Sequence, residues 1–316
     1  MSAASSTSTA QNAVRGMSRL VNVADEPSPD RGRILCGELE AGNILYFPRT
    51  PFDFPDEDIQ FLLTRKQTDT ALHKNIAYRP AVDRITGVEE SSGPGVERLR
   101  AIVRGYSQRS SKFLDSLLTP YQGKWKLDYA SYRPLEERGR PARLRARNDL
   151  PHVDAFPTRP TNGDRILRLF TNINPAQNRV WITSQTFDVV GPHFAKAIGL
   201  PRAEGAGALA RTFRSIAKAA HLPGANRSPY DEFMHNCHNA MKENSEFQQS
   251  CPKQRWEFPP HSTWIVLTDF VSHAVLEGQY ALEQTFIISR DAMVRPQLSP
   301  LRILENLAGH PLTKAN

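Results

Sequence analysis

Two residues of the types that bind metal ions stand two apart in the stretch Pro151-His152-Val153-Asp154. In an extended strand, residues i and i+2 point to the same face, so the imidazole and the carboxylate would project together. A facial triad of two histidines and one carboxylate binds Fe(II) and leaves three positions open for a co-substrate and oxygen. The His-x-Asp motif therefore predicts two ligands of an iron site whose third ligand is distant in the sequence.

The third ligand is predicted near the C-terminus. His273 follows a strand and a turn and enters the next strand, whereas the alternative, His261, stands at the start of its strand; we favour His273. The order His-x-Asp, long gap, histidine, final strand is that of a double-stranded β-helix oxygenase that uses 2-oxoglutarate. His235 and His238 lie three apart on a predicted helix, but no further ligand at metal spacing completes a site, so we interpret them as packing residues.

The distal carboxylate of 2-oxoglutarate needs a buried cation, for which an arginine is best suited. In many such enzymes that cation lies about ten residues after the second histidine, but residues 282–285 are Leu-Glu-Gln-Thr. The strand after the motif offers Arg165 and Arg168 on opposite faces. We favour Arg168, in mid-strand, and expect Arg165, at the strand edge, to lie on the surface.

Three further residues are candidates for binding an anion or a sugar. Arg179 and Trp181 share a face of the next predicted strand, and Arg133 closes the strand before an arginine-rich loop. An arginine beside a tryptophan could hold a carboxylate or a sugar ring, although ordinary pairing on a solvent face is an equal alternative.

The elements that must position these residues divide into two groups. Helical periodicity occurs at residues 56–67 and 95–118, whereas residues 34–48 suggest two short strands around a glycine turn. Strand patterns occupy residues 126–132, 165–174, 179–184, 262–269, 272–276 and 280–289. We predict an α+β fold with a double-stranded β-helix (jelly-roll, cupin-like) core, N-terminal helices and a helical insertion at about residues 192–258. Residues 1–30 are expected to be a disordered leader, 31–295 a single domain and 296–316 a C-terminal tail.

Composition limits the classes of protein and partner. The chain has 316 residues, 39% hydrophobic, and 40 Lys and Arg against 33 Asp and Glu, a net charge of +7. Such a basic surface suggests an anionic partner. No apolar run is long enough to span a membrane, and three scattered cysteines favour a reducing compartment. No GxGxxG or Walker loop and no nucleic-acid module is present, so neither nucleotide nor nucleic-acid binding is expected.

Three long segments resemble the family of Kdo (3-deoxy-D-manno-oct-2-ulosonic acid) hydroxylases. They are HVDAFPTRPTNGDRILRLFTNINP, RVW and HSTWIVLTDFVSHAVLEGQYALEQTFII. The resemblance implies Fe(II), 2-oxoglutarate and O2 as cofactor and co-substrates, with His152, Asp154 and His273 as the iron ligands. It also implies binding of 2-oxoglutarate and substrate by the cofactor-site residues Arg133, Arg168, Arg179 and Trp181.

The resemblance further implies hydroxylation of carbon 3 of Kdo in lipid A-linked lipopolysaccharide, which gives the sugar Ko and releases succinate and CO2. Kdo-lipid A is an anionic glycolipid, and a basic rim at residues 138–147 would attract it. The expected location is the cytoplasm, with possible peripheral contact with the anionic inner membrane face, to which residues 208–222 could contribute. Two alternatives stay open: a dioxygenase acting on a protein or another lipid, and a non-enzymatic anion- or sugar-binding module. The oligomeric state is left open.

Overall fold

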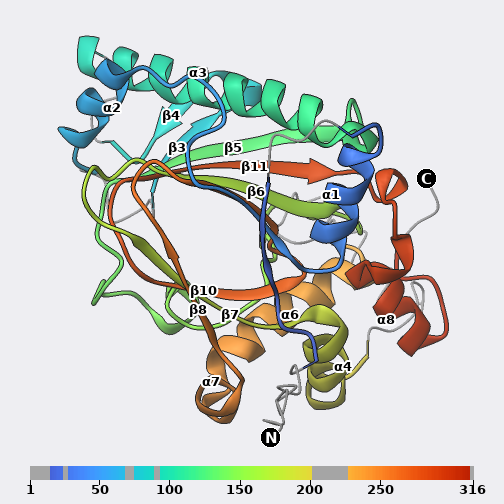
Figure 1. The fold of residues 1–316 in the computed structure, drawn as a ribbon. Coiled ribbons are helices and arrows are strands. Elements are labelled where there is room, and N and C mark those ends of the chain that lie inside the picture. Colours follow the sequence, from blue (N-terminus) through green and yellow to red (C-terminus); the bar gives the residue numbers. More distant parts are fainter. Residues whose placement is uncertain (1–14, 24–27, 68–74, 89–92, 201–226, 314–316) are drawn as a thin grey trace, which may run out of the picture.

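A computed structural model describes residues 15–23, 28–67, 75–88, 93–200 and 227–313 (Figure 1). Its core is two facing β-sheets, one of eight strands and one of three. The larger sheet has the order β1 (Leu20–Asn22), β2 (Ile44–Phe47), β9 (Thr263–Leu267), β6 (Arg165–Asn172), β11 (Ala281–Ile288), β5 (Trp125–Arg133), β3 (Ile76–Arg79) and β4 (Arg84–Thr86). The smaller sheet has the order β10 (Val271–Glu277), β7 (Arg179–Thr186) and β8 (Gln254–Phe258). This arrangement is the predicted α+β fold with a jelly-roll core.

Helices cover the outer sides of this core (Figure 1). The α-helices are α1 (Arg31–Glu40), α2 (Asp56–Leu63), α3 (Pro94–Leu117), α4 (Phe187–Ile198), α6 (Pro229–Glu243), α7 (Ser245–Ser250) and α8 (Pro300–Ala308). Short 3-10 helices lie at Pro80–Val82, Thr119–Tyr121, Leu144–Ala146, Arg290–Ala292 and Pro296–Leu298. The long α3 lies over the larger sheet, whereas α4, α6 and α7 lie near the smaller one (Figure 1).

The central strands of the larger sheet are buried on both faces. Between the sheets, aromatic rings pack together: Phe258 stacks on Trp264 at 3.9 Å between ring centroids, and Phe170 stacks on Trp264 at 5.3 Å. A second apolar cluster lies between the larger sheet and the helices, where α3 contributes Leu99 and Val103. Because both faces are covered, β6 and β9 are buried almost continuously rather than at alternate residues, which fits a sheet held between two layers.

Several sequence predictions hold and one is wrong. The helices expected at residues 56–67 and 95–118 are α2 and α3, and the strands expected from residue 126 onward are β5, β6, β7, β9, β10 and β11. The strand expected at the start of residues 34–48 is instead α1. Its buried residues include Gly32, Leu35, Cys36 and Leu39, at spacings of three, four and seven, so the local pattern is helical.

The structure also differs from the predicted boundaries. In the expected leader, Leu20–Asn22 forms β1, which pairs in parallel with β2 at the edge of the sheet. In the expected tail, Leu301 and Leu304 of α8 are buried. Within the expected helical insertion, β8 pairs with β7. In each case long-range pairing or burial, which local sequence does not encode, organises the segment.

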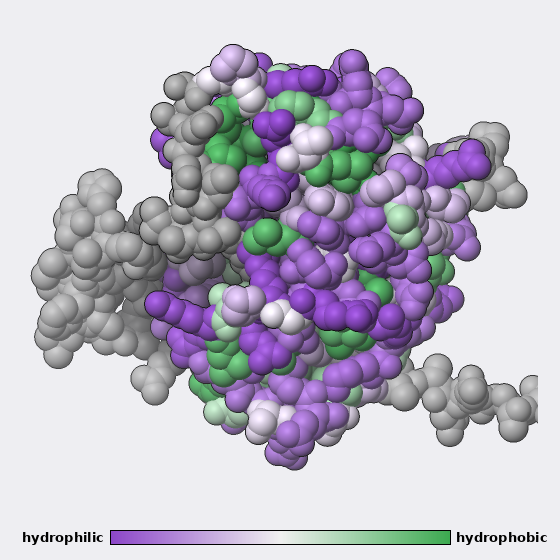
Figure 2. Space-filling view, turned by 90° about the vertical axis from the view of Figure 1, so that its left-hand side faces the viewer, coloured by the Kyte–Doolittle hydropathy of each residue, from purple (hydrophilic) through white to green (hydrophobic). Residues whose placement is uncertain are grey.

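Among the described residues, no helix combines the length and apolar character needed to cross a bilayer. The face drawn in Figure 2 is mostly hydrophilic, with apolar residues in small separate patches. The basic segment at residues 208–222, considered above for contact with a membrane, lies outside the described residues.

Candidate metal and co-substrate site

The His-x-Asp segment is held against β10 by backbone hydrogen bonds. The amide of His152 donates to the carbonyl of His273 at 3.1 Å, and the amide of His273 donates back to the carbonyl of His152 at 2.9 Å. The amide of Asp154 donates to the carbonyl of Thr268 at 2.8 Å. The distant histidine therefore lies directly opposite the first histidine of the motif, through an isolated antiparallel bridge.

The two imidazoles converge on the carboxylate of Asp154. Nε2 of His152 lies 3.6 Å from Oδ1 of Asp154, and Nε2 of His273 lies 4.0 Å from Oδ2 of the same carboxylate. Each imidazole uses its Nδ1 for a backbone carbonyl: His152 bonds to Leu150 at 2.7 Å and His273 to Val271 at 2.9 Å. A protonated Nδ1 leaves the lone pair on Nε2, so both rings present their ligating nitrogen toward Asp154.

Electrostatics favour the protonation states that a metal requires. Burial lowers the pKa of both His152 and His273, although Asp154 opposes this shift in each case. Burial alone would raise the pKa of Asp154, but Arg168 and the neighbouring His152 hold it well below its usual value. Neutral imidazoles beside an ionised carboxylate are the forms that bind a divalent cation.

The donor set fits Fe(II) chemically. Two imidazole nitrogens and one carboxylate match the facial triad of non-heme iron oxygenases. Oδ2 of Asp154 is buried without a hydrogen-bond donor, although Nε of Arg168 lies 3.1 Å away as an ion-pair partner. This carboxylate oxygen therefore has a lone pair that can coordinate a cation.

The structure brings a fourth histidine to the same place. His238, on α6, lies with its ring centroid 4.8 Å from that of His152. Among the described residues, the group whose possible ligand atoms all lie within 4.8 Å of one another is His152, Asp154 and His238, without His273. The Nδ1 of His238 bonds to the carbonyl of Val153 at 2.7 Å. The interpretation of His238 as a packing residue is therefore wrong in one respect, since the residue faces the pocket. The alternative ligand His261 lines a different cavity.

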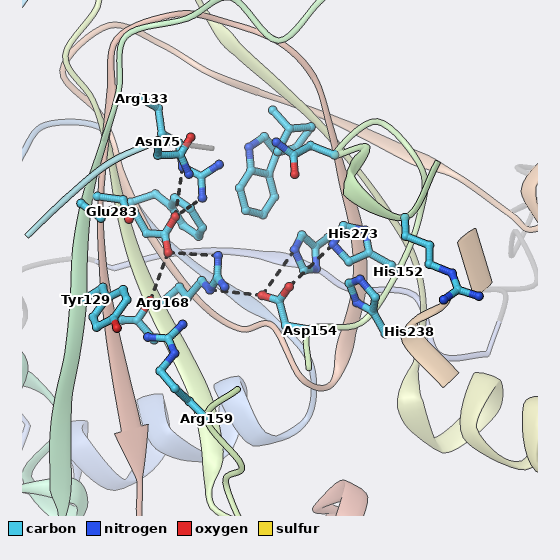
Figure 3. A pocket seen from close by; sticks show the side chains of 18 of the residues that line it. Asn75, Tyr129, Arg133, His152, Asp154, Arg159, Arg168, His238, His273 and Glu283 are labelled. Carbon is cyan, nitrogen blue, oxygen red and sulfur yellow. Dashed lines mark hydrogen bonds and ion pairs between the residues drawn. The ribbon is translucent and has the colours of Figure 1, made fainter. Parts of the chain in front are cut away.

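The pocket above the triad is about 330 Å³ in volume, within the usual range of ligand sites. One wall comes from the larger sheet and carries Arg133, Arg168 and Glu283 (Figure 3). The guanidinium groups of Arg133 and Arg168 both pair with the carboxylate of Glu283; Nη1 of Arg168 lies 3.0 Å from Oε1 of Glu283. Burial opposes the ionisation of Glu283, yet Arg133 and Arg168 lower its pKa below the usual value. Glu283 therefore orients two arginines at the position where related enzymes often carry a cation.

The remaining predicted residues have different positions. Trp181 lines the pocket, stacks on His273 at 5.3 Å, and has a buried indole N–H without an acceptor. Arg179 does not line the pocket: it donates to the carbonyl of Gly278 and pairs with Glu137 at 3.4 Å.

Arg165 is fully buried rather than exposed, because it pairs with the buried carboxylate of Asp269 at 2.7 Å. The expectation that it lies on the surface is therefore wrong.

The other wall of the pocket comes from α6, which sequence reasoning did not connect with the site. His238 and Lys242 are four residues apart, so they share a face of the helix and both line the pocket. Their spacing and the capping box at the N-terminus of α6, formed by Ser228 and Asp231, were visible in the sequence. The contact of His238 and Lys242 with the His-x-Asp site could not be predicted, because they lie far from this motif along the chain.

The predicted basic rim is largely neutralised by local pairing. Arg138 pairs with Glu277, Arg140 with Glu137, Arg145 with Glu243 and Arg147 with Asp149. Residues 138–147 consequently carry a set of ion pairs rather than unpaired positive charges, and of these four arginines only Arg145 lines the pocket.

Comparison with known proteins identifies the relatives of this fold and site. The family described as 3-deoxy-D-manno-oct-2-ulosonic acid (Kdo) hydroxylase matches residues 22–311. A crystal structure of the Kdo hydroxylase KdoO, a non-heme Fe(II) alphaketoglutarate dependent dioxygenase, in complex with cobalt(II) is 32% identical; the match covers 94% of this chain and 98% of that chain at a TM-score of 0.82. The structure of KdoO with alphaketoglutarate and Fe(III) matches at 32% identity, covering 94% and 99% of the two chains at a TM-score of 0.81. No curated protein matches the chain.

Proposed function

The chain belongs to the Kdo hydroxylase family, and on this basis we propose that it is an Fe(II)- and 2-oxoglutarate-dependent dioxygenase that hydroxylates Kdo. The observation that carries the proposal is the convergence of His152, Asp154 and His273 at the base of a cationic pocket, in a fold shared with KdoO. These three residues would hold the iron.

The arginines of the sheet wall fit the distal carboxylate of 2-oxoglutarate. Arg133 and Arg168 balance the two negative charges of Glu283 and Asp154, so the four groups sum to zero. A divalent cation and a dicarboxylate can then enter together without leaving net charge in a buried site, which keeps the desolvation cost low. Trp181 supplies an unused indole N–H in the same pocket.

Arg179 has an indirect part. Its guanidinium and that of Arg133 both approach Oε1 of Glu137, at 3.4 Å and 3.8 Å. Arg179 would thus position the segment that carries Arg133 rather than contact the co-substrate.

Bound Fe(II), together with 2-oxoglutarate and O2, would supply the oxidising chemistry that converts a C–H bond to C–OH, with succinate and CO2 released. The residues of this chain orient the partners and exclude water. Backbone hydrogen bonds fix the two histidines against each other, Glu283 holds the arginines, and the stacked ring of Trp181 supports His273. Such fixed geometry favours a productive approach of the reacting carbon.

We propose carbon 3 of Kdo in lipid A-linked lipopolysaccharide as the site of hydroxylation, giving Ko. Two features support an anionic glycolipid substrate: the net charge of +7 and the cations that line the pocket. An enzyme acting on such a substrate would work in the cytoplasm, in peripheral contact with the anionic inner membrane face.

The test is succinate release with Kdo-lipid A as substrate, compared with peptides and with a lipid lacking Kdo. Release stimulated by Kdo-lipid A alone, with mass spectrometric detection of one added oxygen, is the expected result. Stimulation by a peptide or by the other lipid instead would assign a different substrate to the same machinery. Absence of Fe(II) binding in an anaerobic titration would favour a non-enzymatic binding module.

A further inference from the structure

Lys242 is a buried cation in the pocket, and the proposed reaction assigns no role to it. Its side chain comes from the last turn of α6, is 3% exposed, and lines the same cavity as the triad. Its Nζ donates one hydrogen bond, to the carbonyl of Arg145 at 3.0 Å. An ammonium has three N–H donors, so two can still serve a ligand.

Lys242 differs from the other buried cations around the site in having no carboxylate partner. Arg133 and Arg168 pair with Glu283, and Arg179 pairs with Glu137. For Lys242 the described residues contain no carboxylate within ion-pair distance; Asp154 and Asp149 act on it only from farther away. Burying an ammonium without a counter-ion is unfavourable, which suggests that the counter-ion arrives with the substrate.

The two walls also lie on different sides of the triad. Figure 3 places Arg168 and His238 on opposite sides of Asp154, and Lys242 shares the helical face of His238. If 2-oxoglutarate binds at the sheet wall with its arginines, the substrate binds beside the helical wall. In a 2-ulosonic acid the carboxylate is carbon 1, two bonds from carbon 3, so a group that binds this carboxylate must lie close to the iron ligands. Lys242 meets this requirement because it lies one helical turn after His238, whose ring centroid is 4.8 Å from that of His152, and all three residues line the same pocket.

We propose that Lys242 binds the carboxylate of the sugar-acid substrate and so places carbon 3 over the metal site. This inference rests on the proposed function and adds to it the residue that selects an acidic sugar. His238 accompanies it as a positioning residue, since its bond to the carbonyl of Val153 ties α6 to the segment between the two motif ligands.

Arg79 is the strongest competitor for this role. It lines the pocket, and among the described residues it forms no ion pair; it lies over the ring of Tyr129 at 5.2 Å. However, Arg79 is on β3, in the sheet wall that also carries Arg133 and Arg168. A carboxylate bound there would compete with 2-oxoglutarate for the same wall.

The experiment compares Kdo-lipid A with the same substrate after conversion of its sugar carboxylates to methyl esters. Wild-type enzyme should prefer the acid, and Lys242→Met should lower the ratio of kcat/KM for acid over ester by at least about tenfold, as for loss of a desolvated charge pair. Lys242→Arg, which keeps the charge, should retain most of the preference. Fe(II) binding and the KM for 2-oxoglutarate should not change.

Two control variants complete the test. Arg79→Met removes the competing cation, and Lys112→Met removes an exposed lysine of α3 that does not line the pocket; both should leave the ratio unchanged. An equal loss of activity on acid and ester in Lys242→Met would mean a structural role and would overturn the proposal, as would loss of the preference in Arg79→Met. If wild-type enzyme binds Fe(II) and 2-oxoglutarate but is not stimulated by Kdo-lipid A, the proposed substrate itself is wrong, and this inference with it.

Discussion

The two walls of the pocket hold positive charge in different ways. On the sheet wall, Arg133 and Arg168 share Glu283, and all three side chains stand on adjacent strands whose register is fixed by backbone pairing. On the helical wall, Lys242 donates to a backbone carbonyl, and no carboxylate of the described residues lies within ion-pair distance of it. Paired guanidiniums are pre-organised and stay charged at every physiological pH. The charge of a buried, unpaired ammonium depends on pH much closer to neutrality, because burial lowers its pKa.

This difference suggests a division of labour. The co-substrate is the same in every turnover, and a rigid, permanently charged wall suits it. The substrate must be selected, and a lone cation that is costly without its partner favours ligands that bring a carboxylate. The following four predictions test this contrast, from the largest expected effect to the smallest.

Replacement of His273 by alanine should abolish Fe(II) binding, whereas replacement of His238 should not. His273 is locked to His152 by two backbone hydrogen bonds and presents Nε2 to Asp154. Loss of an iron ligand should reduce activity by more than the roughly 10- to 100-fold that loss of an outer partner costs. Anaerobic Fe(II) titration of both variants measures this. Retained binding in His273→Ala with lost binding in His238→Ala would make His238 the third ligand.

Glu283→Gln should destabilise the protein, and 2-oxoglutarate should restore part of the loss. The variant leaves the buried guanidinium of Arg133 and the partly buried one of Arg168 without their shared carboxylate, and breaking a buried pair costs about 3–5 kcal/mol. Chemical denaturation with and without 2-oxoglutarate measures both effects, with Lys242→Met as the matched case that breaks no ion pair. Equal free energies of unfolding for Glu283→Gln and Lys242→Met would contradict the proposed difference between the two walls.

The preference for an acidic substrate should decline above about pH 8. Burial lowers the pKa of Lys242 to about 8, although Asp154 and Asp149 oppose the shift, so the ammonium is charged below this pH and neutral above it. The kcat/KM for Kdo-lipid A should therefore fall up to tenfold per pH unit above 8, since this parameter reports the free enzyme. In Lys242→Arg the decline should disappear. A decline that persists in that variant would come from another group.

The same shift has a defined sign for stability. The folded-state pKa of Lys242 lies below its ordinary value of 10.5, so between about pH 8 and 10.5 the unfolded chain binds more protons. The contribution of this group to the free energy of unfolding consequently rises with pH across that window.

Ser228→Ala should have the smallest effect. The hydroxyl of Ser228 accepts a hydrogen bond from the amide of Asp231 at 3.1 Å and caps α6. Loss of such a cap costs about 0.5–2 kcal/mol. We expect a matching decrease in the free energy of unfolding, measured by denaturant titration, with unchanged affinity for Fe(II). A large loss of Fe(II) affinity would instead mean that the helical wall supports the triad directly.

The sequence by itself determined the class of fold and indicated the chemistry of the proposed metal site. The spacing of His152 and Asp154 follows from the two-residue repeat of an extended chain, and strand alternation separated Arg168 from Arg165. The long strands were predictable because apolar layers pack on their faces, and this burial requires apolar residues that the sequence displays. The short strands β1 and β8 were not, because they exist only through pairing with β2 and β7.

Only the tertiary structure decided which side chains meet. The bridge that places His273 opposite His152 is formed by backbone atoms that carry no side-chain signal. Glu283 occupies the position where a cation was sought, and its role emerged only when strand register set Arg133 and Arg168 beside it. Lys242 and His238 belong to a helix that lies far along the chain from the motif, and neither helical periodicity nor residue type says which pocket a helix will face. Long-range packing settles that choice, because it depends on how all the elements share one core.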